Sequence, residues 1–221
     1  MKNYGKLTLG LIVGWLVFAF AASALRLFTN DSNRIGFAVA LAASVPILIF
    51  AFWFAMSHGF RNFTLSLNPR ALTVAQTGRI LGFVFVLLEA RGALPAVFAK
   101  PAGYGDMLIG ITASLVGFTL AEPKHRSSFI GWQVLGITDL ILAVGLGVLA
   151  PVLTPDGALI SRMTILPLSL VPTFLVPLFF IFHVISIAQA RSWRFAATDP
   201  GQSAHRLPAL APGQFESPRK A

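Results

Sequence analysis

The chain has 221 residues, of which 56% are hydrophobic and only 11% are charged. This composition lies far from the average of soluble proteins and predicts an all-α, polytopic integral membrane protein with the lipid bilayer as its main partner. The absence of Cys excludes disulfides, iron–sulfur clusters and thiol catalysis. The basic residues that give the formal charge of +9 lie between apolar segments and in the tail, so we interpret them as topology signals and expect no nucleic-acid partner.

Six apolar segments approach the roughly 20 residues that a membrane-spanning helix needs. In chain order they are residues 7–28, 35–57, 69–91, 106–121, 129–150 and 164–190, the fourth being the shortest. The first begins after two lysines, as a secretory signal does, but its apolar core is too long and a second segment follows at once. We therefore predict a bundle of six transmembrane helices over residues 1–190, followed by a basic, disordered cytoplasmic tail over residues 191–221.

Local signals mark two further features of these helices. Asn68 followed by Pro69 predicts an N-cap with proline at the first helical position of the third segment. The sixth segment contains Pro167, Pro172 and Pro177, each of which removes a backbone donor and crowds the carbonyl four residues earlier. We expect this helix to be kinked, either as a static kink or as a hinge beside a cavity.

The distribution of Lys and Arg on alternate sides predicts the orientation. If the N-terminus is inside, the inner segments carry Lys2, Lys6, Arg61, Arg70, Lys124, Arg126 and five basic residues of the tail, and the outer segments carry Arg34, Arg91, Lys100 and Arg162. Arg26 and Arg79 are interpreted as lying at helix ends, from which their side chains reach the interface. The prediction is a protein of a bacterial-type inner membrane with both termini in the cytoplasm.

Ionisable residues within the apolar segments are the candidate functional residues, because a charge at the bilayer centre costs at least about 2.5–3.5 kcal/mol and so faces a partner or a cavity. At 1.5 Å of rise per residue, Glu89 and Asp106 are placed near the outer surface, Asp139 near mid-membrane, and His183 about a turn further in. The depths predict a series of polar groups that crosses the bundle.

Helical periodicity places small residues beside these groups. Asp106 shares a stripe with Gly110, Ala113 and Gly117, and Asp139 shares one with Gln133, Gly136, Ala143 and Gly147. Small residues on such faces favour close packing of helices in membranes. We expect both aspartates to face other helices; the same small-residue faces are candidate contacts for a homo-oligomer or a larger membrane complex.

Specific contacts follow from these placements. Glu89 is expected to pair with Arg26, Arg91 or Lys100 in an outer cluster close to Asp106, because a carboxylate at the end of a helix opposes the helix dipole. Asp106 could alternatively be only the N-cap of its helix.

The candidate pathway or binding residues are Glu89, Asp106, Asp139, His183, Arg26, Arg91 and Gln133. We expect Asp139 to share a cavity or polar contact with His183 and to titrate with it as a coupled pair.

Two classes of function fit these residues. The first is movement of a small solute or a cation coupled to protons, because carboxylates and histidines form proton relays within membranes. The alternative is a membrane-embedded enzyme or a metal- or cofactor-binding subunit that uses the same residues, or an accessory subunit of a larger complex. Asp139 and His183 are the metal-ligand candidates, but the chain lacks an HExxH or ExxH pattern, so no cofactor is predicted and catalytic residues stay unassigned.

Overall fold

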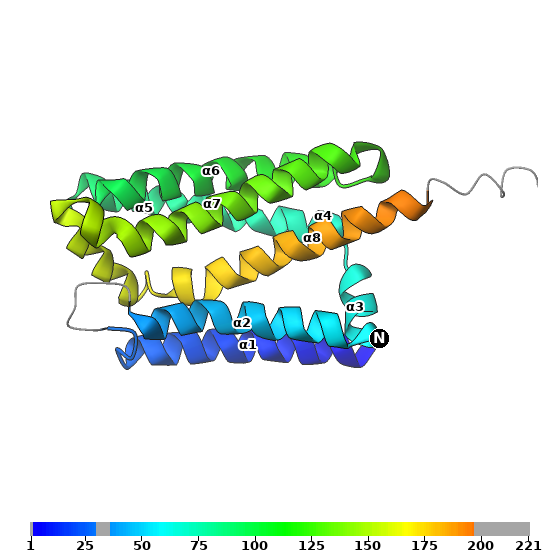
Figure 1. The fold of residues 1–221 in the computed structure, drawn as a ribbon, viewed down its shortest axis with the longest axis horizontal. Coiled ribbons are helices and arrows are strands. Elements are labelled where there is room, and N and C mark those ends of the chain that lie inside the picture. The colour runs from blue at the N-terminus through cyan, green and yellow to red at the C-terminus, as the bar shows by residue number, and fades with distance from the viewer. Residues whose placement is uncertain (1, 30–35, 197–221) are drawn as a thin grey trace, which may run out of the picture.

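The computed structural model describes residues 2–29 and 36–196, which form helices and turns without a β-strand. Five of its helical segments are long and apolar enough to cross a membrane: Tyr4–Ala24, Phe37–Met56, Pro69–Ala90, Pro123–Leu153 and Val171–Trp193. Figure 1 shows the long helices side by side along one axis. The all-α prediction is therefore correct for the described residues.

The first two long helices are α1 (Lys2–Ala24) and α2 (Phe37–Met56). A short helix that the sequence did not predict, α3 (His58–Leu65), follows at once, with the Ser57 side chain accepting a hydrogen bond from the Phe60 backbone N–H. Arg61 of α3 donates to the carbonyls of Phe54 and Ala55, and so satisfies acceptors that the end of α2 leaves free.

The third segment has three parts, α4 (Pro69–Val74), the 3₁₀ helix η1 (Ala75–Gly82) and α5 (Phe83–Ala90). As predicted, Asn68 caps α4, its Oδ1 accepting from the Arg70 N–H at 2.9 Å. A 3₁₀ stretch of this length inside a longer helix is uncommon, and it often marks a functional position.

The fourth helix is longer than predicted. Helix α6 (Ala96–Thr119) begins after the extended Pro95, so Asp106 lies near its middle and is not its N-cap. Lys100 and Pro101 interrupt the apolar pattern, so the sequence pattern did not predict the first turns of this helix. The Lys100 side chain is 54% exposed, which is how a charged residue is tolerated there.

The rest of the chain contains η2 (Pro123–His125), α7 (Arg126–Leu153), η3 (Pro155–Thr164), the π-helical turn η4 (Val171–Leu175) and α8 (Val176–Ala196). The sixth segment thus departs from α geometry at Pro167 and Pro172, whereas Pro177 lies within α8. Thr173 Oγ1 donates to the Ser169 carbonyl at 2.7 Å. Helix α8 runs past the predicted boundary at residue 190. The remainder of the predicted tail, residues 197–221, and Arg34 lie outside the described residues.

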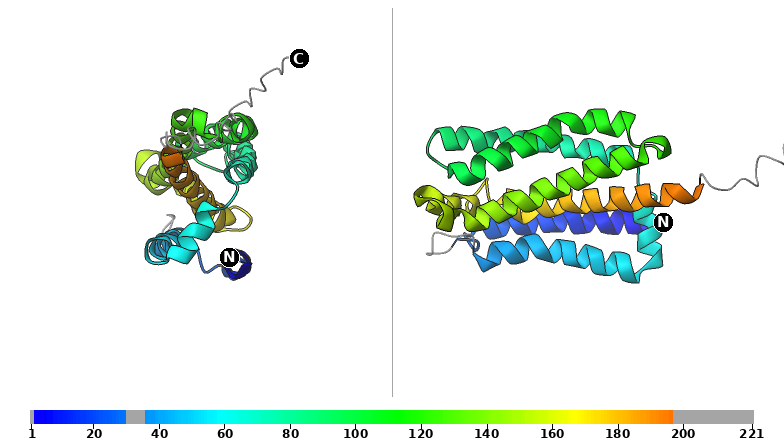
Figure 2. Two further views of the ribbon diagram at one scale, coloured as in Figure 1. Left: turned by 90° about the vertical axis from the view of Figure 1, so that its right-hand side faces the viewer. Right: turned by 45° about the horizontal axis from the view of Figure 1, so that its top comes forward.

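Successive long helices run in opposite directions, so the bundle has two distinct ends (Figure 1). We call the end with α3, the start of α1 and the end of α8 the α3 end, and the opposite end, where η3 lies, the η3 end. Helix α8 lies between the α1–α2 pair and the group formed by α4–α5, α6 and α7 (Figures 1 and 2).

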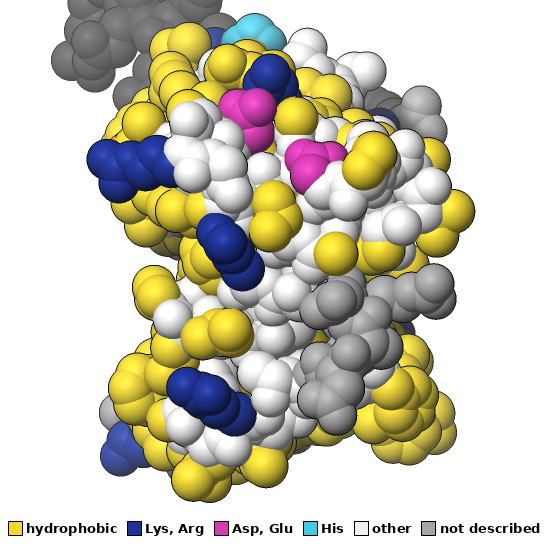
Figure 3. Space-filling view, turned by 90° about the vertical axis from the view of Figure 1, so that its left-hand side faces the viewer, with side chains coloured by type: hydrophobic (Ala, Val, Ile, Leu, Met, Phe, Trp, Pro, Cys, Tyr) yellow, Lys and Arg dark blue, Asp and Glu magenta, His cyan; other side chains and the backbone are white. Residues whose placement is uncertain are grey.

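Two clusters of buried apolar side chains lie in and around the group formed by α4–α5, α6 and α7, one toward each end of the bundle. The cluster at the η3 end joins the α5–α6 turn to η3 and consists of Phe85, Leu94, Phe98, Ala99, Ala102, Ala150, Ile160 and Met163. The cluster at the α3 end consists of Val116, Ala121, Phe129 and Ala190. Figure 3 shows the η3 end face, where acidic and basic side chains lie at the surface. The candidate site lies between these two clusters.

Candidate functional site

Arg79 lies at the centre of the bundle because of the local geometry of η1. A 3₁₀ helix has three residues per turn, so side chains three apart lie on one face. Gln76, Arg79 and Gly82 follow this spacing and are all buried, and Thr73, one step earlier, is fully buried as well. The face so formed presents one guanidinium to α6, α7 and α8.

The guanidinium of Arg79 binds carboxylates from two helices. Its Nε donates to Asp106 Oδ1 of α6 at 2.7 Å, and its Nη2 donates to Asp139 Oδ2 of α7. The three side chains are 1%, 16% and 11% exposed, in the order Arg79, Asp106, Asp139. Arg79 Nη1 also donates to the Gly136 carbonyl at 3.3 Å. Charge-assisted bonds of this kind are among the strongest in proteins.

His183 of α8 completes the cluster. Its Nε2 lies 3.2 Å from Arg79 Nη1 and its Nδ1 lies against Gln133 Oε1. Gln133 Nε2 donates to Thr73 Oγ1 at 3.1 Å, and Thr73 Oγ1 donates to the Pro69 carbonyl at 2.9 Å. Arg79 can only donate, so His183 Nε2 accepts from it and the ring proton lies on Nδ1. From Nδ1 the ring donates to Gln133 Oε1.

We call Arg79, Asp106, Asp139, His183 and Gln133 the Arg79 cluster. Four of its five members were candidates from the sequence, and the predicted interior orientation of Asp139 is confirmed. The contact of Asp139 with His183 is indirect, because Arg79 lies between them. The prediction that Asp106 and Asp139 face other helices is also confirmed.

Arg79 itself was misplaced by the sequence interpretation, which put it at a helix end. It lies ten residues after Pro69 and eleven before Ala90 in the span Pro69–Ala90, which is about 15 Å from either end. The same depth argument that selected Asp139 would therefore have selected Arg79. A long basic side chain was wrongly assumed to reach the interface.

Glycines allow the helices to approach this closely. A Cβ added at Gly136 would overlap the His183 imidazole, one at Gly105 would overlap the Asp139 carboxylate, and one at Gly82 would overlap Asp106 Cβ. Close packing of small residues is the usual way in which membrane helices associate. Here the small residues leave room for the polar side chains themselves.

The charges of the cluster do not balance. Two carboxylates, Asp106 and Asp139, face the single guanidinium of Arg79, and the hydrogen bonds of His183 fit its neutral form. When both carboxylates are ionised, one negative charge is therefore in excess in this largely buried site. Unpaired charges are costly in such surroundings, so the cluster favours the uptake of one positive charge.

Glu89 lies away from this cluster, near the η3 end. It forms an ion pair with Lys100 at 3.4 Å, which confirms one of its three predicted partners. Asp106 is not near it, contrary to the predicted outer cluster. Arg91 is the exposed C-cap residue that follows α5, and Arg26 lies in the turn after α1 with a φ of 56°. The structure brings neither arginine to the Arg79 cluster.

We expect Glu89→Gln to leave stability almost unchanged, by less than about 1 kcal/mol, because its lysine partner is more than half exposed and exposed ion pairs contribute little. The free energy of unfolding of the variant and the wild type, measured in the same detergent micelles, checks this. A loss comparable to that of a buried charge would mean that Glu89 has a partner other than Lys100.

Asp139 and His183 are the metal-ligand candidates from the sequence. Over the described ranges, no three His, Asp or Glu side chains gather closely enough to hold a metal ion. Both ring nitrogens of His183 already have hydrogen-bond partners, and one of these partners is a cation. The arrangement therefore does not fit His183 as a ligand.

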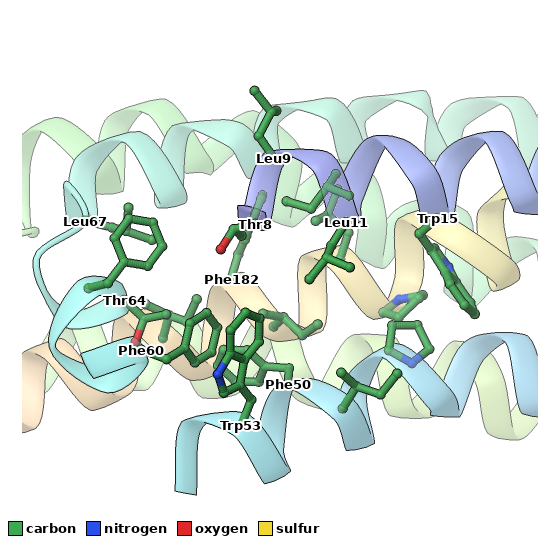
Figure 4. Close-up of a pocket in the computed structure, with 18 of the residues that line it drawn as sticks. Thr8, Leu9, Leu11, Trp15, Phe50, Trp53, Phe60, Thr64, Leu67 and Phe182 are labelled. Carbon is green, nitrogen blue, oxygen red and sulfur yellow. The ribbon is translucent and has the colours of Figure 1, made fainter. Parts of the chain in front are cut away.

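Two cavities adjoin α8. The first, about 380 Å³, lies between α1, α2, α3 and α8, and its lining has no charged side chain. Figure 4 shows it, with Trp15, Phe50, Trp53 and Phe60 around it. The second, about 370 Å³, is bounded by α2, η1, α5, α6, α7 and η4 and includes Arg79 and Asp106 in its wall. We call them the α1 cavity and the Arg79 cavity.

Buried polar groups continue from the cluster toward the α3 end. Gln76 Oε1, Ser186 Oγ and Gln189 Oε1 are buried and have no hydrogen-bond partner among the described residues. Gln189 Nε2 donates to the Leu67 carbonyl at 2.7 Å beside α3. We call these three residues, with Thr73 and Gln133, the polar column. Buried polar atoms without a protein partner are typical positions of ordered water.

Comparison with curated proteins and with solved structures gives no match. Residues 36–191, more than half of the chain, match the family described as "Domain of unknown function (DUF8737)". The matched part begins just before α2 and includes every residue of the Arg79 cluster and of the polar column. On this match, the chain belongs to the DUF8737 family.

Proposed function

We propose that this protein is a six-helix protein of a bacterial-type inner membrane that takes up a proton or a small cation at the Arg79 cluster and couples this step to the movement of a small solute. The observation that carries the proposal is the excess of one carboxylate over the single guanidinium in a buried site. Ionisable groups inside membrane proteins commonly belong to proton or ion pathways.

The six-span topology is supported by the path of α6. This helix runs between the α5–α6 turn and the α6–α7 turn, which lie at opposite ends of the bundle (Figure 1). The α3 end carries Lys6, Arg61, Arg70, Lys124, Arg126 and Arg191, and the η3 end carries Arg26, Arg91, Lys100 and Arg162. By the excess of basic residues, the α3 end and both termini face the cytoplasm.

A proton is the simplest charge that the cluster can take. Protonation of either Asp106 or Asp139 leaves one carboxylate paired with Arg79 and makes the buried site neutral. His183 is positioned to hold the guanidinium and not to carry the proton, because its Nε2 faces a cation. The two carboxylates thus act as one shared proton site, and Arg79 keeps them together.

Access to this site is asymmetric. The polar column leads from the cluster toward the α3 end, whereas on the side of the η3 end the Arg79 cavity is lined by apolar side chains, among them Phe85, Phe98 and Met163. Water at the partnerless atoms of Gln76 and Ser186 would connect the carboxylates to the α3 end. This asymmetry supports the entry of protons from the cytoplasmic side.

Single cysteines test this asymmetry directly, because the natural chain has none. We expect Ser186→Cys, in the polar column, to react with a water-soluble methanethiosulfonate in inside-out vesicles but not in right-side-out vesicles. Ala102→Cys, in the apolar cluster at the η3 end, is the control and should be unreactive from both sides. Equal reaction of Ser186→Cys from both sides, or reaction only from outside, would contradict the proposed access.

Asp139→Asn tests the proton site. We expect this variant to fold, since Asn keeps the shape and Arg79 retains Asp106, but to lose proton uptake because the excess charge is gone. Infrared difference spectra between high and low pH should show a carboxyl that becomes protonated in the wild type and not in the variant. In liposomes that contain a pH-sensitive dye, proton movement should fall in parallel. Unchanged proton uptake by Asp139→Asn would remove the proposal.

A further inference from the structure

We propose that the Arg79 cavity binds a lipophilic amine in its cationic form, with the ammonium group at Asp106 and the apolar body between α2 and α7. This inference rests on the proposed function, because the amine would neutralise the same excess charge as the proton. It names the class of solute that the protein would move. The lining, the charges and the access to the cavity each support it.

The lining of the cavity is amphiphilic. Arg79 and Asp106 are its charged residues, and the other side chains in its wall are apolar. Its volume of about 370 Å³ lies in the range of small-molecule sites, which combine mostly apolar walls with a few polar groups. A ligand that fits has one small polar group and a larger apolar body.

The hydrogen-bond donors and acceptors of the cluster that are still unused determine whether the polar group of the ligand is a cation or an anion. Four of the five N–H groups of Arg79 are already used, by Asp106, Gly136, His183 and Asp139. Asp106 uses only Oδ1 for Arg79, and its other oxygen has no hydrogen-bond partner among the described residues. The cavity therefore offers a negatively charged acceptor, which selects a cationic donor and disfavours an anion.

The position of the cavity fits entry from the lipid. Leu81 and Val148 line it and are 61% and 56% exposed, so the cavity reaches the outer surface of the bundle. A lipophilic amine partitions into the bilayer and can enter there. Protons arrive instead by the polar column, and an ammonium and a proton compete for one negative charge. Such competition is what exchange of the two requires.

Three probes of equal chain length test the assignment: n-octylamine, n-octanol and octanoate. The amine is cationic near neutral pH, as a lysine side chain is. In nanodiscs of zwitterionic phosphatidylcholine, we expect octylamine to raise the unfolding temperature in a concentration-dependent manner, more than the other two probes. The α1 cavity has no charged lining, so occupation of that cavity would not favour the amine and serves as the internal comparison.

Two variants locate the effect. Asp106→Asn should weaken the apparent affinity for octylamine by about thirtyfold or more, as loss of one partner of a buried charge pair does. Ala43→Phe, in the α2 wall of the cavity, should also abolish octylamine stabilisation while proton uptake persists. Glu89→Gln, an acidic residue outside the cavity, is the matched control and should bind as the wild type does.

The outcomes separate this inference from the proposed function. Equal stabilisation by the three probes, preference for octanoate, or unchanged octylamine binding in Ala43→Phe would each overturn the amine site. If the infrared proton signal of the wild type is nevertheless present and absent in Asp139→Asn, the proton site stands without the amine. If both octylamine selectivity and the proton signal are missing, both proposals fail.

Discussion

Arg79→Met should destabilise the protein more than any other single change in the described residues that we consider. The substitution fills a similar volume but leaves Asp106 and Asp139 buried without their cation. Removing one partner of a buried ion pair typically costs about 3–5 kcal/mol. The measurement is the free energy of unfolding in mixed micelles, from titration with a denaturing detergent.

Neutralisation of the carboxylates provides the control for Arg79→Met. In the triple variant Arg79→Met, Asp106→Asn, Asp139→Asn, no buried charge is left unpaired, so most of the lost stability should return. Arg79→Lys should be intermediate, because one ammonium cannot reproduce the fork that contacts α6, α7 and α8. Wild-type stability of the single variant Arg79→Met would mean that Asp106 and Asp139 are not held by Arg79.

Gly136→Ala and Gly105→Ala should have the next largest effects. The added Cβ would overlap the His183 ring in the first case and the Asp139 carboxylate in the second. The helices cannot separate without breaking the hydrogen bonds to Arg79, so we expect a loss of about 1–3 kcal/mol, as for overpacked cores. Unfolding in micelles measures the loss, and the infrared carboxyl signal should weaken because Asp139 or His183 is displaced.

Two glycines on the same helix as Gly136 serve as matched controls. Gly131 and Gly145 of α7 have no atom of a neighbouring element within 4 Å of an added Cβ. Ala is favoured over Gly in a helix by about 0.8–1 kcal/mol, so Gly131→Ala and Gly145→Ala should leave stability unchanged or raise it. A loss at Gly136 no larger than at these positions would contradict the close approach of α7 to α8.

The sequence was sufficient for features that depend on local chemistry. The apolar segments indicated long helices, because burying apolar surface needs no specific partner. The N-cap at Asn68 was predictable because its hydrogen bond to Arg70 lies within one turn. The small residues beside Asp106 and Asp139 indicated which faces meet other helices, since a helix repeats every 3.6 residues.

Boundaries and backbone geometry were less accessible from the sequence. The start of α6 was missed because Lys100 and Pro101 lower the local apolar content, although the helix tolerates both. The 3₁₀ stretch η1 was not predicted either; it packs against α6 so closely that a Cβ added at Gly110 would overlap the backbone of Ile80.

The sequence by itself determined that this protein is helical and that its helices are long and apolar. It named Asp139, Asp106, His183 and Gln133 as candidates together with Glu89, Arg26 and Arg91, and left open whether Asp106 was only a helix cap. Only the tertiary structure decided that Arg79 is the shared partner of both aspartates and His183, because its contacts join residues 27, 60 and 104 positions apart along the chain. Burial makes each polar group costly on its own, which the sequence reveals. The pairing of these groups depends on how four helices pack against one another. The residue pattern of a single helix does not contain that information.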